Sequence, residues 1–293
     1  MAPRLQAFLA IVLWGISFVA TRLALREVEP VTLIFTRFAL GVALLLTVLA
    51  VRRVPLLPPR STWPALATMG FVGIFVHQLL QSYALTLTTA VRTGWLIGII
   101  PIWSALLAAI FLRERFGAGK IAGLALGFLG AVLVVTRGRF EPGLLALPST
   151  RGDLLILVST VTWAVYTVLG HETIRRLGSL RATAGAMLAG WLMLSPWFLG
   201  AGGWRELAHV SNVGWAAILF LGIGCSGLAY WFWYGALERV ETSRVAAFLY
   251  LEPLVTVAAA VPLLGERVDW STVAGGAVVL TGVALVQRSG KRP

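Results

Sequence analysis

The segment Pro101-Ile-Trp-Ser-Ala-Leu-Leu-Ala-Ala-Ile-Phe-Leu-Arg-Glu-Arg115 has a counterpart 152 positions later, Pro253-Leu-Val-Thr-Val-Ala-Ala-Ala-Val-Pro-Leu-Leu-Gly-Glu-Arg267. The two segments share the first proline, the final Glu-Arg pair and an apolar run between them. Further matches at this offset pair Ala84-Leu85 with Ala236-Leu237, Arg92 with Arg244, Gly123 with Gly275, and Gly130 with Gly282. A weaker match at an offset of 149 pairs Leu13-Trp14-Gly15 with Thr162-Trp163-Ala164. Self-similarity at a fixed offset predicts two copies of one structural unit.

The composition predicts an all-α integral membrane protein. Hydrophobic residues make up 58% of the 293 residues and charged residues 12%, with a mean hydropathy of +0.87. Soluble domains carry about a quarter charged residues, whereas apolar runs of about 20 residues form transmembrane helices. The sequence contains ten such runs: Leu5–Leu25, Val31–Val51, Pro64–Leu85, Val91–Leu112, Ala118–Thr136, Leu154–Gly170, Thr183–Leu199, Val213–Leu237, Ser243–Leu264 and Trp270–Val286.

The positions of the basic residues predict that both termini are cytoplasmic. With the amino terminus inside, the inner segments hold fourteen Lys and Arg residues and the outer loops hold six. Cytoplasmic loops of membrane proteins collect these residues, so the net charge of +12 needs no nucleic-acid partner. The first span is longer than a signal-peptide core and has a counterpart in the sixth span. We therefore expect it to be retained.

The ten spans divide into two halves of five. We assign residues 1–137 to the first five-helix repeat, 138–152 to a linker, 153–287 to the second repeat and 288–293 to a basic cytoplasmic tail. Because five is odd, the second repeat must enter the membrane from the opposite side. Inverted repeats are a building plan of secondary transporters, which bind substrate near the bilayer midplane at the repeat interface. The alternative is a duplicated membrane protein that does not transport.

Short motifs recur along almost the whole chain. In the first half they are Leu13-Trp14-Gly15 with Phe18-Val19, Glu29-Pro30, Arg37-Phe38, Tyr83-Ala84-Leu85, Pro101 with Leu112 and Glu114-Arg115, and Gly123 with Gly130. The second half carries Ala236-Leu237, Glu252-Pro253, Leu264-Gly265-Glu266-Arg267, Gly275 and Gly282. In this order and spacing the motifs resemble the EamA type of the drug/metabolite transporter (DMT) superfamily.

The resemblance implies a ten-helix exporter of small metabolites in the bacterial inner membrane. It also implies a central cavity lined by helices 1–4 and 6–9, with the fifth and tenth helices at the periphery. Amino acids, aromatic ones included, are a common substrate class for such relatives. This sequence departs from strict symmetry because Ala186 lies near the place where Arg37 would repeat. The first span also lacks the membrane-embedded Glu of proton-coupled small multidrug pumps, which leaves open whether the substrate gradient or proton exchange drives transport.

Charged side chains within apolar spans need a compensating role, because a charge near the bilayer centre is costly. Glu252 precedes Pro253, which removes a backbone donor and can open the helix. It is either a titratable gate or proton site, or a structural acid paired with Arg37 or Arg244. Arg37 either binds a substrate carboxylate or snorkels or pairs internally. Arg92 and Arg244 hold equivalent positions at span starts, which favours anchoring of helix ends over contact with an anion.

Polar and aromatic side chains in mid-span are the candidate substrate-binding residues. His77 and Gln81 share a helix face, and unpaired polar groups are costly in hydrocarbon, so they either line a cavity or bond a neighbouring helix. Repeat symmetry should bring the helix face of Trp14 and Ser17 towards that of Trp163 and Tyr166. Aromatic walls with scattered polar groups suit flat amphiphilic ligands. The full set is Trp14, Ser17, His77, Gln78, Gln81, Trp95, Trp163, Tyr166 and Tyr250.

Other classes of protein fit the sequence poorly. The single cysteine, Cys225, forms neither an internal disulfide nor a metal cluster, so no cofactor or metal is expected. A nucleotide-binding loop is missing, which argues against direct ATP coupling. A membrane-embedded enzyme, a passive channel, and a drug or nucleoside-type efflux carrier are the alternatives. The expected partners are a small-molecule substrate and the lipid bilayer. A monomer is favoured, with Gly119, Gly123 and Gly127 packing inside the subunit rather than at a dimer contact.

Overall fold

The computed structural model of the chain describes residues 1–103, 106–107, 117–139, 147–239 and 247–289. Within these ranges the chain is helical apart from turns and short connections, as the composition predicted. In the described part of the chain, six helices are long and apolar enough to cross a membrane, and four shorter apolar helices lie in the other predicted spans. Parts of the fourth and ninth spans lie outside the described residues, as do Arg244, Glu114 and Arg115.

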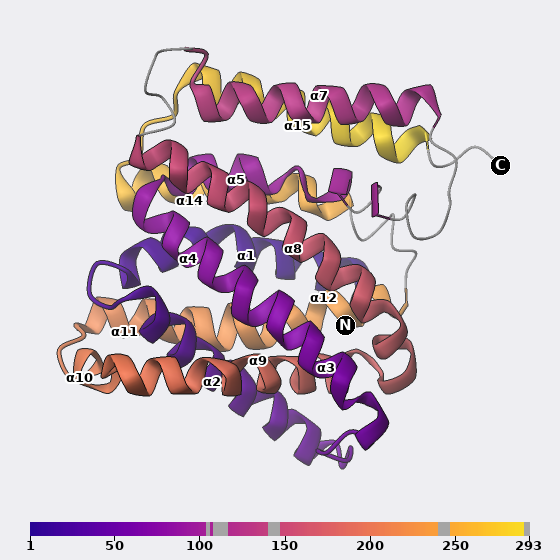
Figure 1. The fold of residues 1–293 in the computed structure, drawn as a ribbon, viewed down its shortest axis with the longest axis vertical. Helices are drawn as coiled ribbons and strands as arrows, with labels where there is room; N and C mark the ends of the chain where they lie inside the picture. Colours follow the sequence, from indigo (N-terminus) through magenta and orange to yellow (C-terminus); the bar gives the residue numbers. More distant parts are fainter. Residues whose placement is uncertain (104–105, 108–116, 140–146, 240–246, 290–293) are drawn as a thin grey trace.

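The helices run side by side as a bundle (Figure 1). Those of the first half are α1 (Pro3–Ala24), α2 (Pro30–Val51), η1 (Arg60–Thr62), α3 (Trp63–Met69), η2 (Gly70–Val76), α4 (His77–Leu87), α5 (Ala90–Ile97) and α7 (Ala118–Thr136). Those of the second half are α8 (Pro148–Leu177), α9 (Ser179–Ala201), α10 (Gly203–Leu207), α11 (Asn212–Leu219), η4 (Phe220–Ala229), α12 (Tyr230–Leu237), η5 (Ala247–Leu251), α14 (Glu252–Leu264) and α15 (Trp270–Ser289).

Prolines set the starts of several helices. Pro3, Pro30 and Pro148 stand in the first turn of α1, α2 and α8, where a missing N–H leaves no helical bond unmade. Helix α8 therefore begins inside the segment 138–152 that we had assigned to the linker. Before Pro101 the helix is interrupted by a turn at residues 98–99, and before Pro253 the chain forms the 3-10 helix η5. Both copies thus leave α geometry next to the repeated proline.

The third span of each half contains a π-helical segment that the periodicity did not predict. In the first half η2 separates α3 from α4, and in the second half η4 separates α11 from α12. Both segments are rich in glycine, which is a weak α-helix former. The two π-helices occupy equivalent places in the repeat, and such segments occur frequently at functional sites.

Helix α1 is the central helix of the bundle. It contacts α4 and α5 of the first half and α11, η4, α12 and α14 of the second. Gly15 permits the approach of α14, because a Cβ at this position would lie 2.7 Å from the Val255 Cβ and 3.1 Å from the Glu252 carbonyl oxygen. The missing side chain at Gly15 thus brings Glu252 close to the centre of the bundle.

Helices α7 and α15 pack against each other along one edge of the bundle (Figure 1). A Cβ at Gly123 would lie 2.5 Å from the Gly282 carbonyl oxygen, and a Cβ at Gly130 would lie 2.6 Å from that of Gly275. The two contacts are reciprocal, because Gly123 corresponds to Gly275 and Gly130 to Gly282 in the sequence repeat. This exchange of partners is the relation that a two-fold axis produces, and it makes the two helices antiparallel. Gly123 packs within the subunit, as expected.

Carboxylates join the two halves at the end of the bundle formed by loops 25–29, 88–89, 208–211 and 265–269, here called the capped end. The free N–H groups at a helix amino terminus attract carboxylates. Each carboxylate caps a helix of the other half: Glu266 accepts from Ala90 and Val91 at α5 (2.9 Å each), Glu206 from Glu29 at α2 (2.7 Å) and Glu27 from Ser211 at α11 (2.6 Å). Arg22 of α1 also pairs with Glu266 at 3.3 Å.

Arg92 forms a buried anchor near the capped end. Its guanidinium donates to the carbonyl oxygens of Val134 (3.0 Å) and Val135 (2.9 Å), which end α7, and pairs with Asp153 of α8. Asp153 is fully buried and also accepts a 2.5 Å hydrogen bond from the Thr88 hydroxyl. Arg92 thus ties α5 to α7 and to the first helix of the second half.

Candidate functional site

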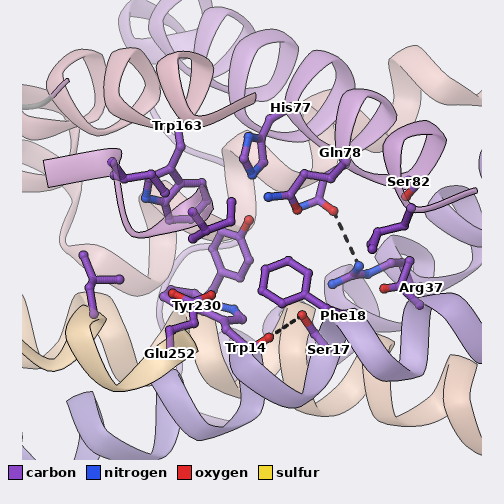
Figure 2. Close-up of a pocket in the computed structure, with 16 residues that line it drawn as sticks. Trp14, Ser17, Phe18, Arg37, His77, Gln78, Ser82, Trp163, Tyr230 and Glu252 are labelled. Carbon is purple, nitrogen blue, oxygen red and sulfur yellow. Dashed lines mark hydrogen bonds between the residues drawn. The ribbon is translucent and has the colours of Figure 1, made fainter. Parts of the chain in front are cut away.

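A cavity lies in the middle of the bundle (Figure 2). Its walls come from both halves of the chain and from the segments that follow η2 and η4. The lining residues are Trp14, Ser17, Phe18, Thr21, Arg37, His77, Gln78, Gln81, Ser82, Leu85, Ile97, Ile100, Trp163, Tyr230, Leu249 and Glu252.

Many lining residues are related to one another by the sequence repeat. At the 149-residue offset Trp14 corresponds to Trp163, and at the 152-residue offset Gln78 corresponds to Tyr230, Ile97 to Leu249 and Ile100 to Glu252. Both members of every pair line the cavity. The cavity therefore lies where the two halves meet.

The aromatic wall is a cluster of edge-to-face rings. Trp14 and Trp163 meet with ring centroids 5.6 Å apart and planes at 82°. Tyr230 lies 5.4 Å from Trp14 and 5.8 Å from Trp163, a range in which aromatic pairs attract beyond their buried area. The Trp14 indole N–H donates to the carbonyl oxygen of Cys225 in η4 at 3.2 Å. The expected meeting of the Trp14 and Trp163 faces is thus present.

Polar groups of α4 line the cavity beside Trp163 and across from Trp14 (Figure 2). The His77 Nδ1 lies 2.9 Å from the Ser159 carbonyl oxygen and 3.1 Å from the Thr162 hydroxyl. Because a carbonyl oxygen only accepts, Nδ1 carries the hydrogen of this bond. The His77 ring also lies 5.2 Å from the Trp163 ring. His77 therefore both lines the cavity and bonds the neighbouring helix α8, which combines the two interpretations left open by the sequence.

Among the described residues, two charged side chains reach the cavity, and each is 5% exposed. Arg37 of α2 donates from Nε to the Ser226 hydroxyl of η4 at 3.0 Å and from Nη1 to the Gln78 amide oxygen at 3.5 Å. Glu252 stands at the start of α14, on the opposite side of the cavity from Arg37 (Figure 2). The ion pair that we considered between Glu252 and Arg37 is not formed.

Several predicted site residues lie elsewhere. Trp95 packs its ring against Gly276 of α15, and Tyr166 is buried against Gly73 of η2 with Tyr234 as a ring neighbour. Both side chains pack in the hydrophobic core. Their positions along the predicted helices therefore did not distinguish core residues from cavity residues. Arg92 forms the anchor described above rather than a cavity wall. The side chain of Tyr250 and the whole of Arg244 lie outside the described residues.

Sequence reasoning also missed several residues. Tyr230 lines the cavity and could have been found, because it corresponds to the candidate Gln78 at the 152-residue offset. Asp153 was overlooked because it stands one position before the sixth predicted span. The missed lining residues are Phe18, Thr21, Ser82, Leu85, Ile97, Ile100, Tyr230 and Leu249. In the part of the chain that the structure describes, no cluster of three or more His, Cys, Asp or Glu side chains is placed to hold a metal ion.

Known proteins similar to this chain match it nearly end to end. An uncharacterized transporter of Archaeoglobus fulgidus is 33% identical over 277 residues, which is 94% of each chain. A probable terminal-alkyne amino-acid exporter of Streptantibioticus cattleyicolor is 29% identical over 283 residues, covering 96% of this chain and 91% of that protein. A protein of known crystal structure shares the fold with a TM-score of 0.68, at 23% identity and over 99% of both chains.

The family model of the EamA-like transporters matches residues 3–136 and again residues 150–288. The two matched ranges correspond to the two halves that the 152-residue offset relates. The resemblance drawn from the motifs is thereby confirmed, and the protein is a multi-pass membrane transporter rather than an enzyme. This chain belongs to the EamA-like transporter family.

Proposed function

We propose that this protein is a ten-helix secondary transporter of the bacterial inner membrane that exports small amphiphilic metabolites, with amino acids, including aromatic ones, as the leading class. The two halves form inverted repeats with both termini in the cytoplasm, and they alternate access to the central cavity. The observation that carries the proposal is the cavity itself, because repeat-related residues of both halves line it.

The lining supports an amphiphilic substrate. Trp14, Trp163 and Tyr230 form an apolar wall, while Gln78 and Arg37 offer hydrogen-bonding groups a short distance away. Sites for small molecules combine apolar walls with a few placed polar groups in this way. One protein that this chain matches over most of its length is a probable exporter of a terminal-alkyne amino acid. This similarity supports the same substrate class.

The packing of the halves supports the inverted arrangement. The contacts between α7 and α15 are antiparallel and reciprocal, as an axis relating two inverted units requires. Alternating access also needs one end of the cavity closed at a time. The capped end suits that role, since Glu266, Glu206 and Glu27 each bridge the two halves there.

The test is counterflow in proteoliposomes loaded with unlabelled amino acids. We expect saturable exchange of a labelled aromatic amino acid, lost in Trp163→Ala, whose side chain forms part of the aromatic wall. Trp204→Ala is the matched control, because Trp204 is half exposed in α10 and lies away from the cavity lining. Repeating the assay with and without a pH gradient distinguishes proton exchange from facilitated transport.

Failure of every amino acid to exchange would refute the substrate class. Nucleosides and cationic drugs would then be examined in the same vesicles, because the flat aromatic wall also suits a drug or nucleoside-type carrier. Flux that does not saturate would instead indicate a passive channel.

A further inference from the structure

Arg37 is a buried cation whose contacts in the described part of the chain are with neutral groups. Its guanidinium contacts the Ser226 hydroxyl, the Gln78 amide oxygen and the ring of Phe38. Among the residues that the structure describes, no carboxylate pairs with it. A guanidinium carries five N–H donors, so two hydrogen bonds leave part of this donor set available. A buried charge without a counter-charge is destabilising, which makes Arg37 a place where an anionic group of a ligand is favoured.

Glu252 presents the opposite case on the other side of the cavity. Its side chain lines the cavity and is 5% exposed. Within the described part of the chain it takes part in no ion pair and accepts no side-chain hydrogen bond. The backbone of Glu252 is held in place, since its carbonyl oxygen accepts from Thr256 at 2.9 Å. The carboxyl group thus stands at the cavity wall without a partner among the described residues.

The two charges lie at a similar depth along α1 but on different sides of it. The Glu252 carbonyl oxygen lies next to Gly15. Arg37 binds Ser226, whose neighbour Cys225 accepts from the indole of Trp14. Figure 2 shows Arg37 to one side of the cavity and Glu252 to the other, with Phe18 and Tyr230 between them. A ligand in the cavity therefore meets a cation on one wall and an acid on the other.

The sequence repeat shows that the two halves contribute similar apolar residues to the cavity but differ at Arg37 and Glu252. Glu252 corresponds to Ile100, and the position in the second half nearest to an equivalent of Arg37 is Ala186. The apolar walls are instead repeated, as Ile97 with Leu249 and as the two tryptophans. Each half thus adds one charge, of opposite sign, to a cavity whose apolar part is common to both.

We propose that the cavity selects a zwitterion: the substrate carboxylate binds Arg37 beside Ser226 and Gln78, and the substrate ammonium binds Glu252. This proposal rests on the proposed transport function and specifies the recognised chemistry. Guanidinium matches a carboxylate with parallel hydrogen bonds. The apolar side group of the substrate lies against Trp14, Trp163 and Tyr230.

The arrangement also rejects close analogues that carry one charge. A carboxylic acid without the ammonium leaves Glu252 unpaired, and an amine without the carboxylate leaves Arg37 unpaired. Specificity of this kind arises because the wrong ligand leaves a buried charge uncompensated. Cationic drugs are disfavoured on the same ground.

The experiment is competition against counterflow of labelled phenylalanine or leucine, whichever exchanges faster. The competitors are the matching acid without the amino group (3-phenylpropanoate or 4-methylpentanoate) and the matching amine without the carboxylate (phenethylamine or isoamylamine). We expect wild type to prefer the amino acid over each analogue by about 10- to 100-fold, as for loss of a charged hydrogen bond.

Two substitutions assign the two ends of the substrate. Glu252→Gln should reduce the preference over the acid and leave the preference over the amine. Arg37→Gln should do the reverse. The charge-conserving variant Glu252→Asp should retain both preferences, and Arg37→Lys should weaken the preference over the amine less than Arg37→Gln does, because an ammonium keeps the charge but not the parallel hydrogen bonds. Glu172→Gln changes an exposed acid on α8 outside the cavity and is the matched control. Combining Ile100→Glu with Glu252→Ile keeps the net charge but moves the acid, and it should not restore ammonium recognition.

The outcomes separate the two proposals. If wild type exchanges no amino acid, the proposed substrate class and the zwitterion site are both wrong. If amino acids exchange but wild type accepts the single-charge analogues equally well, only the zwitterion site is overturned, and this holds even where the variants fail to fold. The same conclusion follows if both glutamine variants keep the wild-type preferences, or if the relocated acid restores recognition.

Discussion

Replacing Gly123 by alanine tests the contact between α7 and α15. A Cβ at this position would lie 2.5 Å from the Gly282 carbonyl oxygen and 2.6 Å from Val286 Cγ2, whereas ordinary contacts are 3.4–4 Å. The carbonyl oxygen belongs to a helix backbone and cannot turn aside. The two helices must therefore separate by roughly 1 Å at this point, which weakens the dispersion contacts around it.

The expected magnitude follows from two opposing effects. Overpacking a close contact costs about 1–3 kcal/mol, while alanine stabilises a helix by up to about 1 kcal/mol relative to glycine. Gly200→Ala in α9 isolates the second effect, because nothing lies within 4 Å of a Cβ there. We expect Gly123→Ala to be less stable than Gly200→Ala by about 1–3 kcal/mol.

Double variants test whether the contact is reciprocal. Gly123 faces Gly282, but its repeat equivalent Gly275 faces Gly130, roughly 10 Å away along the helix at 1.5 Å per residue. Alanines at 123 and 282 together should lower the free energy of unfolding by less than the sum of the two single substitutions, since the first alanine already separates the helices. Alanines at 123 and 275 should add within about 0.5 kcal/mol.

The assay is denaturant unfolding of the purified protein in detergent, followed by circular dichroism. Equal stability of Gly123→Ala and Gly200→Ala would refute the close contact. Coupling between positions 123 and 275 as strong as that between 123 and 282 would refute the reciprocal pairing.

Three further outcomes follow from the structure. Asp153→Ala leaves Arg92 as an unpaired buried cation and should destabilise the protein by about 3–5 kcal/mol in the same unfolding assay, whereas the double change Asp153→Leu with Arg92→Met should recover most of this loss. Hydrogen bonds from the Ser211 backbone N–H and hydroxyl lower the pKa of Glu27, so its contribution to stability is full above the ordinary carboxyl pKa and is lost as the pH falls through the lowered value. An unfolding series from pH 7 to acid should show this loss, and Glu27→Gln should remove it. Cys225 is buried and donates to a backbone carbonyl oxygen, so its thiol should react with a maleimide only after denaturation; rapid labelling of the native protein would contradict its burial.

The fold class and the family could be predicted because they depend on patterns that local sequence carries. Apolar runs set the helices, and the 152-residue offset identified the two halves that the family model matches separately. The same repeat predicted that Trp14 would meet Trp163, since equivalent faces lie on opposite sides of one axis. Their place in the middle of a span also distinguished them from Trp63 and Trp270, which are exposed near helix starts.

The remaining features depend on distant contacts that no local pattern encodes. Trp95 has the same periodicity as a cavity residue, and only the absence of a side chain at Gly276 draws its ring towards α15. Glu266 was part of a recognised motif, but its binding to the first turn of α5 could not be read from spacing. The π-helical segments are likewise set by packing around glycines rather than by periodicity, since the apolar pattern through Gly222 reads as ordinary α-helix.

The reciprocal glycine contact has a consequence for the origin of the chain. Because Gly123 meets the equivalent of Gly130 and Gly130 meets the equivalent of Gly123, the surface around them is complementary to itself. Two separate copies of a single ancestral unit could have assembled through this surface as a homodimer. Fusion of two such genes would then require no new interface. Later divergence, such as Glu252 at the position that corresponds to Ile100, could give each half its own chemistry while the contact between α7 and α15 was kept.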